Sequence, residues 1–312
     1  MKNADLIWMN GEFVAWDDAK IHVLTHGLHY GTGILEGVRC YDSEIGPAVF
    51  RHQDHIDRMF YGSEMYFMEI PYSKEQIRKA TLELIGRNNL RACYIRPLVY
   101  RGYGTMGLFP LEAPVDVAIA VWEWGSYLGD DGKANGIRAK VVSWRRSSPD
   151  AFIPHAKATG PYLNSVLAKC EAHHAGYEEA ILLDDKGYVC EGSGENIYLV
   201  REGKIVTPPQ SGSILDGITR KAVLQIARDL GYEVQERQVG RGELYLAEEV
   251  FVTGTAAELT PLREIDDRRV GDGRPGEITL ALQTAFEDAL YGRSAQYHEW
   301  LDPVPAFAKV EA

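Results

Sequence analysis

The sequence has few cysteines and no long apolar run. Its four cysteines, Cys40, Cys93, Cys170 and Cys190, include no Cys-x-x-Cys pair, so neither a zinc framework nor a disulfide framework is indicated. The first residues contain no apolar segment of signal-peptide type, and no run of about 18 apolar residues follows. We therefore expect a cytoplasmic protein with free thiols and no membrane partner.

Basic residues are also in deficit, with 33 Lys and Arg against 45 Asp and Glu and a formal charge of −12. This excess of negative charge makes nucleic acid an unfavourable partner, although a local basic pocket for a small anion remains compatible with it. The chain has neither an internal repeat nor a low-complexity segment. Its 312 residues, 45% of them hydrophobic and 25% charged, suffice for two globular domains.

Short strand-like segments outnumber helical ones. Residues 5–16 predict a β-hairpin that turns at Asn10-Gly11, and Ser73-x-x-Gln76 predicts a capping box at a helix start. We expect further strands at residues 37–41, 48–50, 92–101, 115–124, 138–144, 179–184, 188–190, 197–200, 249–253 and 262–265. We expect helices at residues 52–68, 73–88, 162–174, 218–230 and 277–291. This mixture favours an α+β fold over a regular alternation of strands and helices.

Residues 125–136 are rich in Gly, Asp and Asn and show little periodicity. Such a composition is typical of a connecting segment. We therefore predict a small N-terminal domain over residues 1–124, an interdomain loop over 125–136, and a larger C-terminal domain over 137–312.

Lys157 is the residue whose side chain points most clearly to a catalytic role. It stands in residues 155–160 (His-Ala-Lys-Ala-Thr-Gly), where the flanking alanines and the scarcity of charge favour partial burial. A lysine amine can hold a carbonyl cofactor as a Schiff base and can then move a proton as general base and acid. Alone, such a lysine is usually a solvated loop residue. Its interpretation therefore depends on the motifs that follow it.

Two acids, Glu191 and Glu195, stand in residues 191–196 (Glu-Gly-Ser-Gly-Glu-Asn). A carboxylate beside the nitrogen of a pyridine ring keeps that nitrogen protonated, as pyridoxal phosphate (PLP) chemistry requires. The glycines permit close approach of the backbone to a flat ring. The structural alternative is a β-hairpin whose acids are solvated.

Two further segments have features of anion-binding sites. Residues 217–220 (Gly-Ile-Thr-Arg) begin an amphipathic helix, and helix N-termini bind anions. We expect Asp216 to cap this helix or to face away from the anion. Residues 253–257 (Thr-Gly-Thr-Ala-Ala) follow a strand and expose amides, and Arg58 offers a cation. A plain capped helix, a tight turn and a solvated arginine are the alternatives.

Together these motifs resemble a branched-chain amino-acid aminotransferase of PLP fold type IV. The resemblance covers nearly the whole chain and depends on residues 29–32, 36–39, 94–98, 106–107, 124–129, 156–158, 191–196, 217–220 and 254–258. It implies an α+β fold in which a small N-terminal α/β domain precedes a larger domain with a β-barrel-like core, and PLP lies between them. It also implies a homodimer or higher homo-oligomer in which residues 106–108 reach the neighbouring subunit's site.

The resemblance assigns roles around the cofactor. Lys157 is implied as the Schiff-base lysine and proton shuttle, Glu191 rather than Glu195 as the partner of the pyridine nitrogen, and Tyr162 as the partner of the ring hydroxyl. The residues implied to hold the phosphate are Arg58, Ile218, Thr219 and Thr255.

The resemblance also assigns the substrate pocket. The implied ligands of the substrate α-carboxylate are the amides of Thr255 and Ala256, with Tyr94. Arg96 is a candidate for the γ-carboxylate of glutamate, because its planar fork suits bidentate pairing. The implied apolar walls are Tyr30, Leu35, Gly37, Trp124 and Tyr127.

The implied reaction is a ping-pong transfer of amino groups between leucine, isoleucine or valine and 2-oxoglutarate, which yields branched 2-oxo acids and L-glutamate. Leu35 stands where relatives frequently have a larger aromatic residue, and Glu123 where an uncharged one is frequent, so substrate preference stays open. Within the fold, the alternatives are a D-amino-acid transaminase, an (R)-amine transaminase and an aminodeoxychorismate lyase. Tyr94-x-Arg96 and Met106-Gly107 favour the branched-chain class.

Alternatives outside this chemistry are a metal-dependent hydrolase or metal-binding module and a non-catalytic binding protein with the same fold. The metal alternative depends on histidine pairs: His26-x-x-His29, His52-x-x-His55 and His173-His174. Carboxylate partners are not clustered around any of these pairs in the sequence, which disfavours a metal site. A chain that only binds would lack a cofactor on Lys157.

Overall fold

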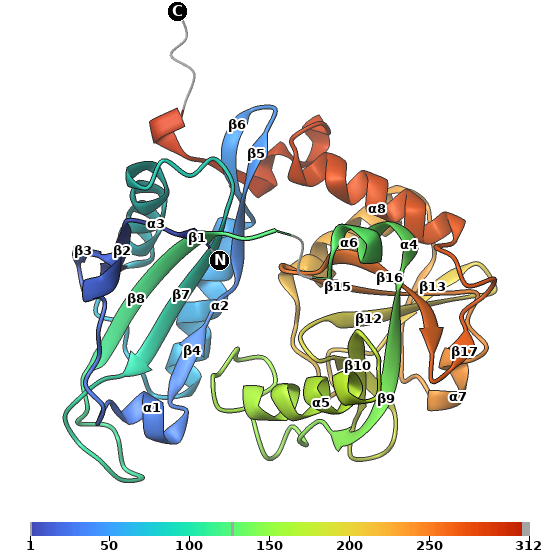
Figure 1. The fold of residues 1–312 in the computed structure, drawn as a ribbon, viewed down its shortest axis with the longest axis horizontal. Coiled ribbons are helices and arrows are strands. Elements are labelled where there is room, and N and C mark those ends of the chain that lie inside the picture. The colour runs from blue at the N-terminus through green and yellow to red at the C-terminus, as the bar shows by residue number, and fades with distance from the viewer. Residues whose placement is uncertain (1, 126–127, 308–312) are drawn as a thin grey trace, which may run out of the picture. The chain divides into compact units, whose positions relative to one another are not determined.

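The computed structural model describes residues 2–125 and 128–307 and divides into two compact units (Figure 1). Unit 1 comprises Met1–Trp124, Ala156–Gly160 and Asp288–Ala312, and unit 2 comprises Gly125–His155 and Pro161–Glu287. The predicted continuous domain over 137–312 is therefore wrong at two segments. Residues 156–160 group with unit 1 because Lys157 pairs through its backbone with Leu35, and the C-terminal segment does so because it adds a strand to the sheet of unit 1.

Unit 1 is built on one sheet. Its strands are β1 (Lys2–Asn3), β2 (Leu6–Met9), β3 (Glu12–Ala15), β4 (Gly33–Leu35), β5 (Val38–Ser43), β6 (Gly46–Phe50), β7 (Cys93–Arg101), β8 (Val115–Glu123) and β18 (Leu301–Pro303). Among the described residues the strand order is β18-β6-β5-β7-β8-β2-β3, with β1 paired to β8 and β4 to β7. All these pairings are antiparallel.

Two long helices of unit 1, α2 and α3, pack against each other and against strands of this sheet. The helical elements of the unit are η1 (Trp16–Asp18), α1 (His26–Tyr30), α2 (His52–Met65), α3 (Lys74–Arg87), η2 (Ala295–Trp300) and η3 (Pro305–Phe307). Helix α2 ends before the predicted residue 68, because Phe67 adopts a left-handed φ of 56°. The long β7 places Tyr94 and Arg96 on the same face of the sheet, since side chains alternate along a strand.

Local sequence signals account for two of the turns. Asn10 and Gly11 have φ values of 49° and 95°, and positive φ at both central residues is what a tight two-residue hairpin requires. The amide of Gln76 donates to Ser73 Oγ at 3.2 Å, and the amide of Ser73 donates to Gln76 Oε1 at 2.8 Å. The predicted hairpin and the predicted capping box are both confirmed.

Unit 2 contains a closed ring of strands. Its strands are β9 (Ile137–Arg145), β10 (Glu179–Leu183), β11 (Val189–Gly192), β12 (Asn196–Arg201), β13 (Lys204–Thr207), β14 (Val234–Glu236), β15 (Glu249–Gly254), β16 (Glu258–Ile265) and β17 (Arg268–Arg269). Six of them follow the order β11-β10-β9-β16-β15-β12, and a further pairing of β11 with β12 closes the ring. Apolar side chains such as Ile181, Leu199 and Val252 pack in one buried cluster. The α+β fold and the barrel-like core are confirmed.

The helices of unit 2 include one within the predicted interdomain loop. They are α4 (Asp130–Asn135), α5 (Tyr162–His174), α6 (Ile218–Asp229), α7 (Arg241–Leu244) and α8 (Glu277–Leu290), whose last residues belong to unit 1. Helix α4 occupies the loop segment, where Lys133 pairs with Glu258 and, at 2.7 Å, with Glu287. These ion pairs order a segment that its composition predicts to be irregular. No helix among the described residues is long and apolar enough to cross a bilayer.

Candidate functional site

Lys157 lies in an extended segment that the backbone of unit 1 holds in place. The amide of Leu35 donates to Lys157 O at 3.0 Å, and the amide of Thr159 donates to Gly33 O at 2.8 Å. The alanines on either side are buried, whereas Lys157 itself is half-buried. The alternative of a solvated loop lysine is therefore wrong: strand β4 fixes the backbone from which this amine projects.

Arg58 belongs to a buried charged cluster on α2. Its Nε and Nη2 donate to the two carboxylate oxygens of Glu36 at 2.6 and 2.8 Å, and His55 Nδ1 lies 2.7 Å from Glu36 Oε2. Glu36 is 1% exposed and Arg58 5%, so the alternative of a solvated helix arginine is wrong. No spacing rule relates Glu36 or His55 to Arg58, so the sequence does not predict this cluster.

The charge state of this cluster follows from its burial. Burial by itself raises the pKa of Glu36, but Arg58 and His55 hold that pKa well below its usual range. Burial lowers the pKa of His55; Glu36 opposes this shift, while Arg58 and Lys157 reinforce it. At neutral pH the cluster is therefore a carboxylate, a guanidinium and a neutral imidazole. The influence of Lys157 on His55 places the lysine amine within electrostatic reach of the cluster.

Tyr94 is the centre of an aromatic group in unit 1. Its buried ring meets that of Trp124 edge-on with centroids 4.6 Å apart, and Trp122 lies at 5.0 Å. A Cβ on residue 37 would fall 2.1 Å from the Tyr94 hydroxyl, so only Gly37 leaves room for this side chain. The guanidinium of Arg96 lies over the Tyr94 ring at 5.4 Å. Its Nε is buried with no hydrogen-bond partner in the described parts of the chain.

Leu35 and Tyr30 are the other pocket residues that we predicted in unit 1. Leu35 is half-buried at the end of β4. Tyr30 is 43% exposed at the end of α1, where its ring packs on His26 at 4.5 Å. Tyr127 lies outside the described residues. The structure thus gathers Gly37, Tyr94, Arg96 and Trp124.

Glu191 is a buried acid held by a cation and an amide of unit 2. It is 8% exposed on β11, and its Oε2 accepts a hydrogen bond from the amide of Leu215 at 3.1 Å. Its Oε1 lies 2.9 Å from Arg146 Nε. The alternative of a hairpin with solvated acids is therefore wrong, because the carboxylate has partners within the protein.

Glu195 differs from Glu191 in its charge. Burial and the neighbouring Glu179 raise the pKa of Glu195 to about 8, so it is mostly protonated at neutral pH. Its Oε2 accepts from the amide of Gly194 at 3.1 Å. A neutral carboxyl does not hold a proton on a pyridine nitrogen as a carboxylate does, so Glu191 fits that role and Glu195 does not.

The first turn of α6 has the features of an anion site. Gly217 is the N-cap residue and provides no side-chain cap, and Ile218 and Thr219 are buried in the first turn. Asp216, which we expected to cap the helix or to face away from the anion, pairs with Lys221 at 2.6 Å and accepts from Gln210 at 2.9 Å. The first amides of a helix have no partner within the helix, so such a turn suits an incoming anion.

The turn after β11 is joined to the start of α6 and to the turn after β15. Glu191 binds the amide of Leu215, and Asn196 Nδ2 donates to the carbonyl of the same leucine at 2.9 Å. A Cβ on Gly254 would lie 3.4 Å from the carbonyl oxygen of Gly194, so the two turns are in contact. Thr255 and Ala256, in the turn after β15, are half-buried, as is Tyr162, the first residue of α5.

The donor set fits pyridoxal phosphate. An aldehyde needs an amine, which Lys157 provides, and a protonated ring nitrogen needs an anion, which Glu191 provides. A phosphate needs amide and hydroxyl donors and a cation, which the first turn of α6 with Thr219 and the guanidinium of Arg58 provide. Each of these groups is held by contacts within its own unit.

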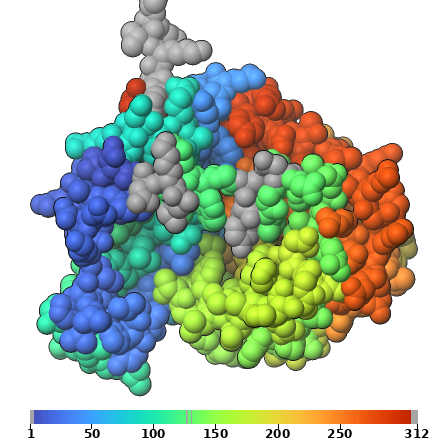
Figure 2. All heavy atoms as spheres, in the orientation of Figure 1, coloured from blue at the N-terminus to red at the C-terminus, as the bar shows by residue number. Residues whose placement is uncertain are grey.

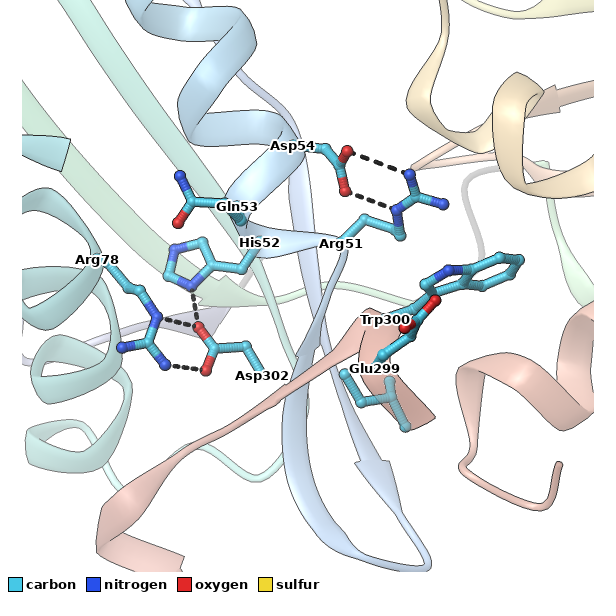
Figure 3. A pocket seen from close by; sticks show the side chains of 9 residues that line it. Arg51, His52, Gln53, Asp54, Arg78, Glu299, Trp300 and Asp302 are labelled. Atoms are coloured by element: carbon cyan, nitrogen blue, oxygen red, sulfur yellow. Dashed lines mark hydrogen bonds and ion pairs between the residues drawn. The ribbon is translucent and has the colours of Figure 1, made fainter. Parts of the chain in front are cut away.

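A separate pocket in unit 1, of about 370 Å³, is lined by charged residues that pair with one another (Figure 3). Arg51 Nε donates to Asp54 at 2.6 Å, while His52 and Arg78 both bind Asp302 at 2.8 Å. Because these cations already have acidic partners, the pocket has no evident excess of positive charge for a phosphate.

Three of the paired histidines, His26, His52 and His55, are engaged in other contacts. His26 bonds to Thr32 Oγ1 at 2.8 Å and to Gly107 O at 2.7 Å, whereas His52 binds the carboxylate of Asp302 and His55 that of Glu36. Over residues 2–125 and 128–307, no group of three or more His, Cys, Asp or Glu side chains is arranged to hold a metal ion.

Comparison with known proteins gives one consistent family. Residues 33–265 match the family described as amino-transferase class IV. The branched-chain-amino-acid aminotransferase of Salmonella typhimurium is 47% identical over 304 residues, which cover 97% of this chain and 98% of that protein. The crystal structure of the Escherichia coli branched-chain amino acid aminotransferase is similar with a TM-score of 0.95 at 46% identity, over 96% of this chain and 99% of that one. The Thermobaculum terrenum enzyme in its PLP form gives a TM-score of 0.90 at 34% identity, over 97% and 99%.

Proposed function

This chain belongs to the class IV aminotransferases, and we propose that it transfers amino groups between branched-chain L-amino acids and 2-oxoglutarate with PLP as cofactor. The names of its relatives and the near-complete coverage of both chains support this substrate class. The observation that carries the proposal is Lys157, an amine that β4 holds by its backbone in a half-buried position. The fold type IV architecture is shown by the solved relatives and by the closed ring of strands.

Lys157, Glu191 and Tyr162 have the central roles in this proposal. PLP, when bound, supplies an electron sink for the charge that develops at the substrate α-carbon. Lys157 would hold the cofactor through its amine, and this amine, once the substrate has displaced it, would take the α-proton and return it. The carboxylate of Glu191 keeps a proton on the pyridine nitrogen, and the Tyr162 hydroxyl binds the ring oxygen.

The phosphate is bound in this proposal by Arg58, Ile218, Thr219 and Thr255. The first amides of α6 and the two threonine hydroxyls donate to the phosphate oxygens, and the guanidinium of Arg58 balances their charge. Glu36 holds Arg58 through two hydrogen bonds, which fixes the direction of its remaining donors. Arg58 would therefore offer the phosphate donors whose direction is set within unit 1.

The substrate is bound through its α-carboxylate and its side chain. We assign the α-carboxylate to the amides of Thr255 and Ala256, with the Tyr94 hydroxyl. Arg96 receives the γ-carboxylate of glutamate, and its Nε, which lacks a hydrogen-bond partner among the described residues, supports this assignment. The residues that we assign to the apolar walls for a branched side chain are Tyr30, Leu35, Gly37, Trp124 and Tyr127.

A homodimer or higher homo-oligomer is part of the proposal. Large apolar side chains are exposed in the loop after β7, where Leu108 is 90% and Phe109 69% exposed. On α5, Leu163 is 72% and Val166 54% exposed, and Figure 2 shows this helix at the surface in yellow-green. Clustered exposed apolar side chains mark interaction surfaces. Light scattering of the purified chain tests the proposal, and a monomer at micromolar concentration would contradict it.

We also propose that the chain acts in the cytoplasm. Its four cysteines have free thiols, and three of them are buried. Free buried thiols are typical of proteins from reducing compartments. Fractionation of the native cells with an antibody against the chain would test this assignment.

A substrate screen tests the proposed function. L-leucine, L-valine, D-alanine and an (R)-arylamine are each offered with 2-oxoglutarate to the PLP-loaded enzyme, and glutamate formation is measured. We expect L-leucine and L-valine to react fastest. Faster turnover of D-alanine or of the arylamine would contradict the proposal and would favour one of the other transaminases of this fold.

A further inference from the structure

Arg146, directly after β9, connects the turn after β11 to helix α5. Its Nη1 donates to Asn164 Oδ1 at 3.0 Å and to Ser165 Oγ at 2.9 Å. Its Nη2 donates to the carbonyl oxygens of Gly192 and Ser193 at 3.0 and 3.1 Å. The side chain is 13% exposed. The guanidinium therefore has a fixed place beneath the turn that follows Glu191.

The third nitrogen of this guanidinium faces the acid itself. Arg146 Nε lies 2.9 Å from Glu191 Oε1 but makes no hydrogen bond to the described residues, so the contact is an ion pair in which the N–H is not aimed at the oxygen. The other oxygen, Oε2, accepts from the amide of Leu215. Glu191 thus has a cation at one oxygen and a neutral donor at the other.

The other titratable groups near Glu191 are mostly neutral at neutral pH or paired with an opposite charge. Burial and Glu179 raise the pKa of Glu195 to about 8, which keeps it mostly protonated. Burial, followed by the charge of Glu191, raises the pKa of the Cys190 thiol. Glu179 pairs with Lys169. Arg146 therefore supplies the positive charge that balances Glu191.

We propose that Arg146 is a positioning residue for the cofactor: it fixes the carboxylate of Glu191 in place and stabilises its ionised form. This inference rests on the proposed function, in which Glu191 faces the pyridine nitrogen. A carboxylate that is buried without a cation is more easily protonated, and a protonated Glu191 would no longer hold the proton on the ring. Arg146 thereby extends to lower pH the range in which Glu191 is ionised and the ring is bound with a protonated nitrogen.

Binding of pyridoxamine 5'-phosphate to the full-length, cofactor-free chain tests this inference. This probe keeps the ring nitrogen and the phosphate but has no aldehyde, so its affinity does not include a covalent bond to Lys157. We would measure its dissociation constant by fluorescence at pH 6 and pH 8 for Arg146→Gln and Arg146→Lys, with and without Glu191→Gln. Arg138→Gln is the matched control, because it removes an arginine–glutamate pair with Glu264 from strand β9, which ends directly before Arg146.

The charge on residue 146 decides the expected result. At pH 6 we expect R146Q to weaken binding about tenfold or more, as expected for a lost contact to a charged group, and at pH 8 clearly less. R146K, which keeps the charge, should stay within about threefold of the native chain at both pH values. In the E191Q background, R146Q should add less than about twofold, because coupling requires both partners. R138Q should leave the affinity unchanged.

Three outcomes would overturn the inference. The first is an equal loss in R146Q and R146K that does not depend on pH. The second is a full R146Q effect that persists in the E191Q background. If thermal unfolding shows that R146Q does not fold, R146K decides, and a loss of about tenfold at both pH values would count against the proposal. Failure of the native chain itself to bind the probe would instead contradict the proposed function.

Discussion

Each unit of the molecule has a buried arginine–glutamate pair in its part of the candidate site, and the two pairs differ in geometry. In unit 1, Glu36 is 1% exposed and takes two hydrogen bonds from Arg58 and a third contact from His55. In unit 2, Glu191 lies 2.9 Å from Arg146 Nε without a hydrogen bond from it and accepts from the amide of Leu215. The first pair is joined by a two-point hydrogen-bonded fork, whereas the second is joined by charge alone.

This difference matches opposite roles under the proposed function. In unit 1 the arginine faces the phosphate, and the glutamate is its support. In unit 2 the glutamate faces the ring nitrogen, and the arginine is its support. One kind of ion pair can therefore prepare a site for an anion or for a cation, according to which partner faces the ligand.

The largest expected effect comes from breaking the pair in unit 1. Glu36→Ala leaves Arg58 charged and buried without its carboxylate, which should lower the free energy of unfolding by about 3–5 kcal/mol. Urea unfolding of the cofactor-free chain measures this. Glu75→Ala is the control, since Glu75 is 55% exposed and pairs at the surface, where ion pairs have little effect. An equally small loss for both variants would show that the pair does not support Arg58.

Glu191 on β11 and Glu195 in the turn that follows it provide a second comparison, within unit 2. Glu191→Gln removes the anion and should lower kcat with L-leucine by about 100-fold or more, because proton handling at the cofactor contributes on that order. Glu195→Gln replaces a group that is already mostly neutral and should keep kcat within about threefold at pH 7. A larger loss in E195Q than in E191Q would reverse the assignment.

The raised pKa of Glu195 predicts a pH dependence of stability. The folded chain keeps the proton up to about pH 8, whereas an unfolded glutamic acid loses it near its ordinary pKa of 4.5. Between these values the folded state binds more protons, so this group makes stability fall as pH rises, by at most about 1.4 kcal/mol per pH unit. Thermal unfolding from pH 5 to 8 should show a shallower decline in E195Q. Parallel pH curves for the two chains would exclude this effect.

Arg96 extends the comparison, because its buried Nε has no hydrogen-bond partner among the described residues. Arg96→Leu should raise the KM for 2-oxoglutarate about tenfold or more, the usual loss for a charged hydrogen bond, while the KM for L-leucine changes little. Arg39→Leu is a control from the neighbouring strand, where Arg39 donates to the carbonyl of Trp124. Equal rises in both KM values for R96L would point to a collapsed pocket instead.

Local signals predicted much of the fold. Helix α6 matches the predicted residues 218–230 to within one residue, because its apolar periodicity lies in adjacent residues, and the Asn10-Gly11 turn depends on the φ preferences of two residues. The closure of the barrel through β11 and β12 and the grouping of residues 156–160 with unit 1 depend on pairings between distant segments. Such pairings leave no periodic pattern in the sequence.

The candidate site likewise contains residues that the sequence could predict and residues that it could not. Lys157, Glu191 and the start of α6 could be predicted, since each stands in a short motif with its own chemistry. Their supports could not, because Glu36 is 22 residues from Arg58 and Arg146 has no motif of its own. Residue preference left two orientations open for Asp216, and its ion pair with Lys221 could not be predicted from it.

The most direct test of the account is to locate the cofactor on the chain. The PLP-loaded protein is reduced with sodium borohydride, digested and analysed by mass spectrometry, which identifies the lysine that carries the phosphopyridoxyl group. We predict a single modified residue, Lys157, and loss of the visible absorption band in Lys157→Ala. Modification at another lysine, such as Lys133 or Lys169, or no modification after loading with excess PLP, would contradict the account.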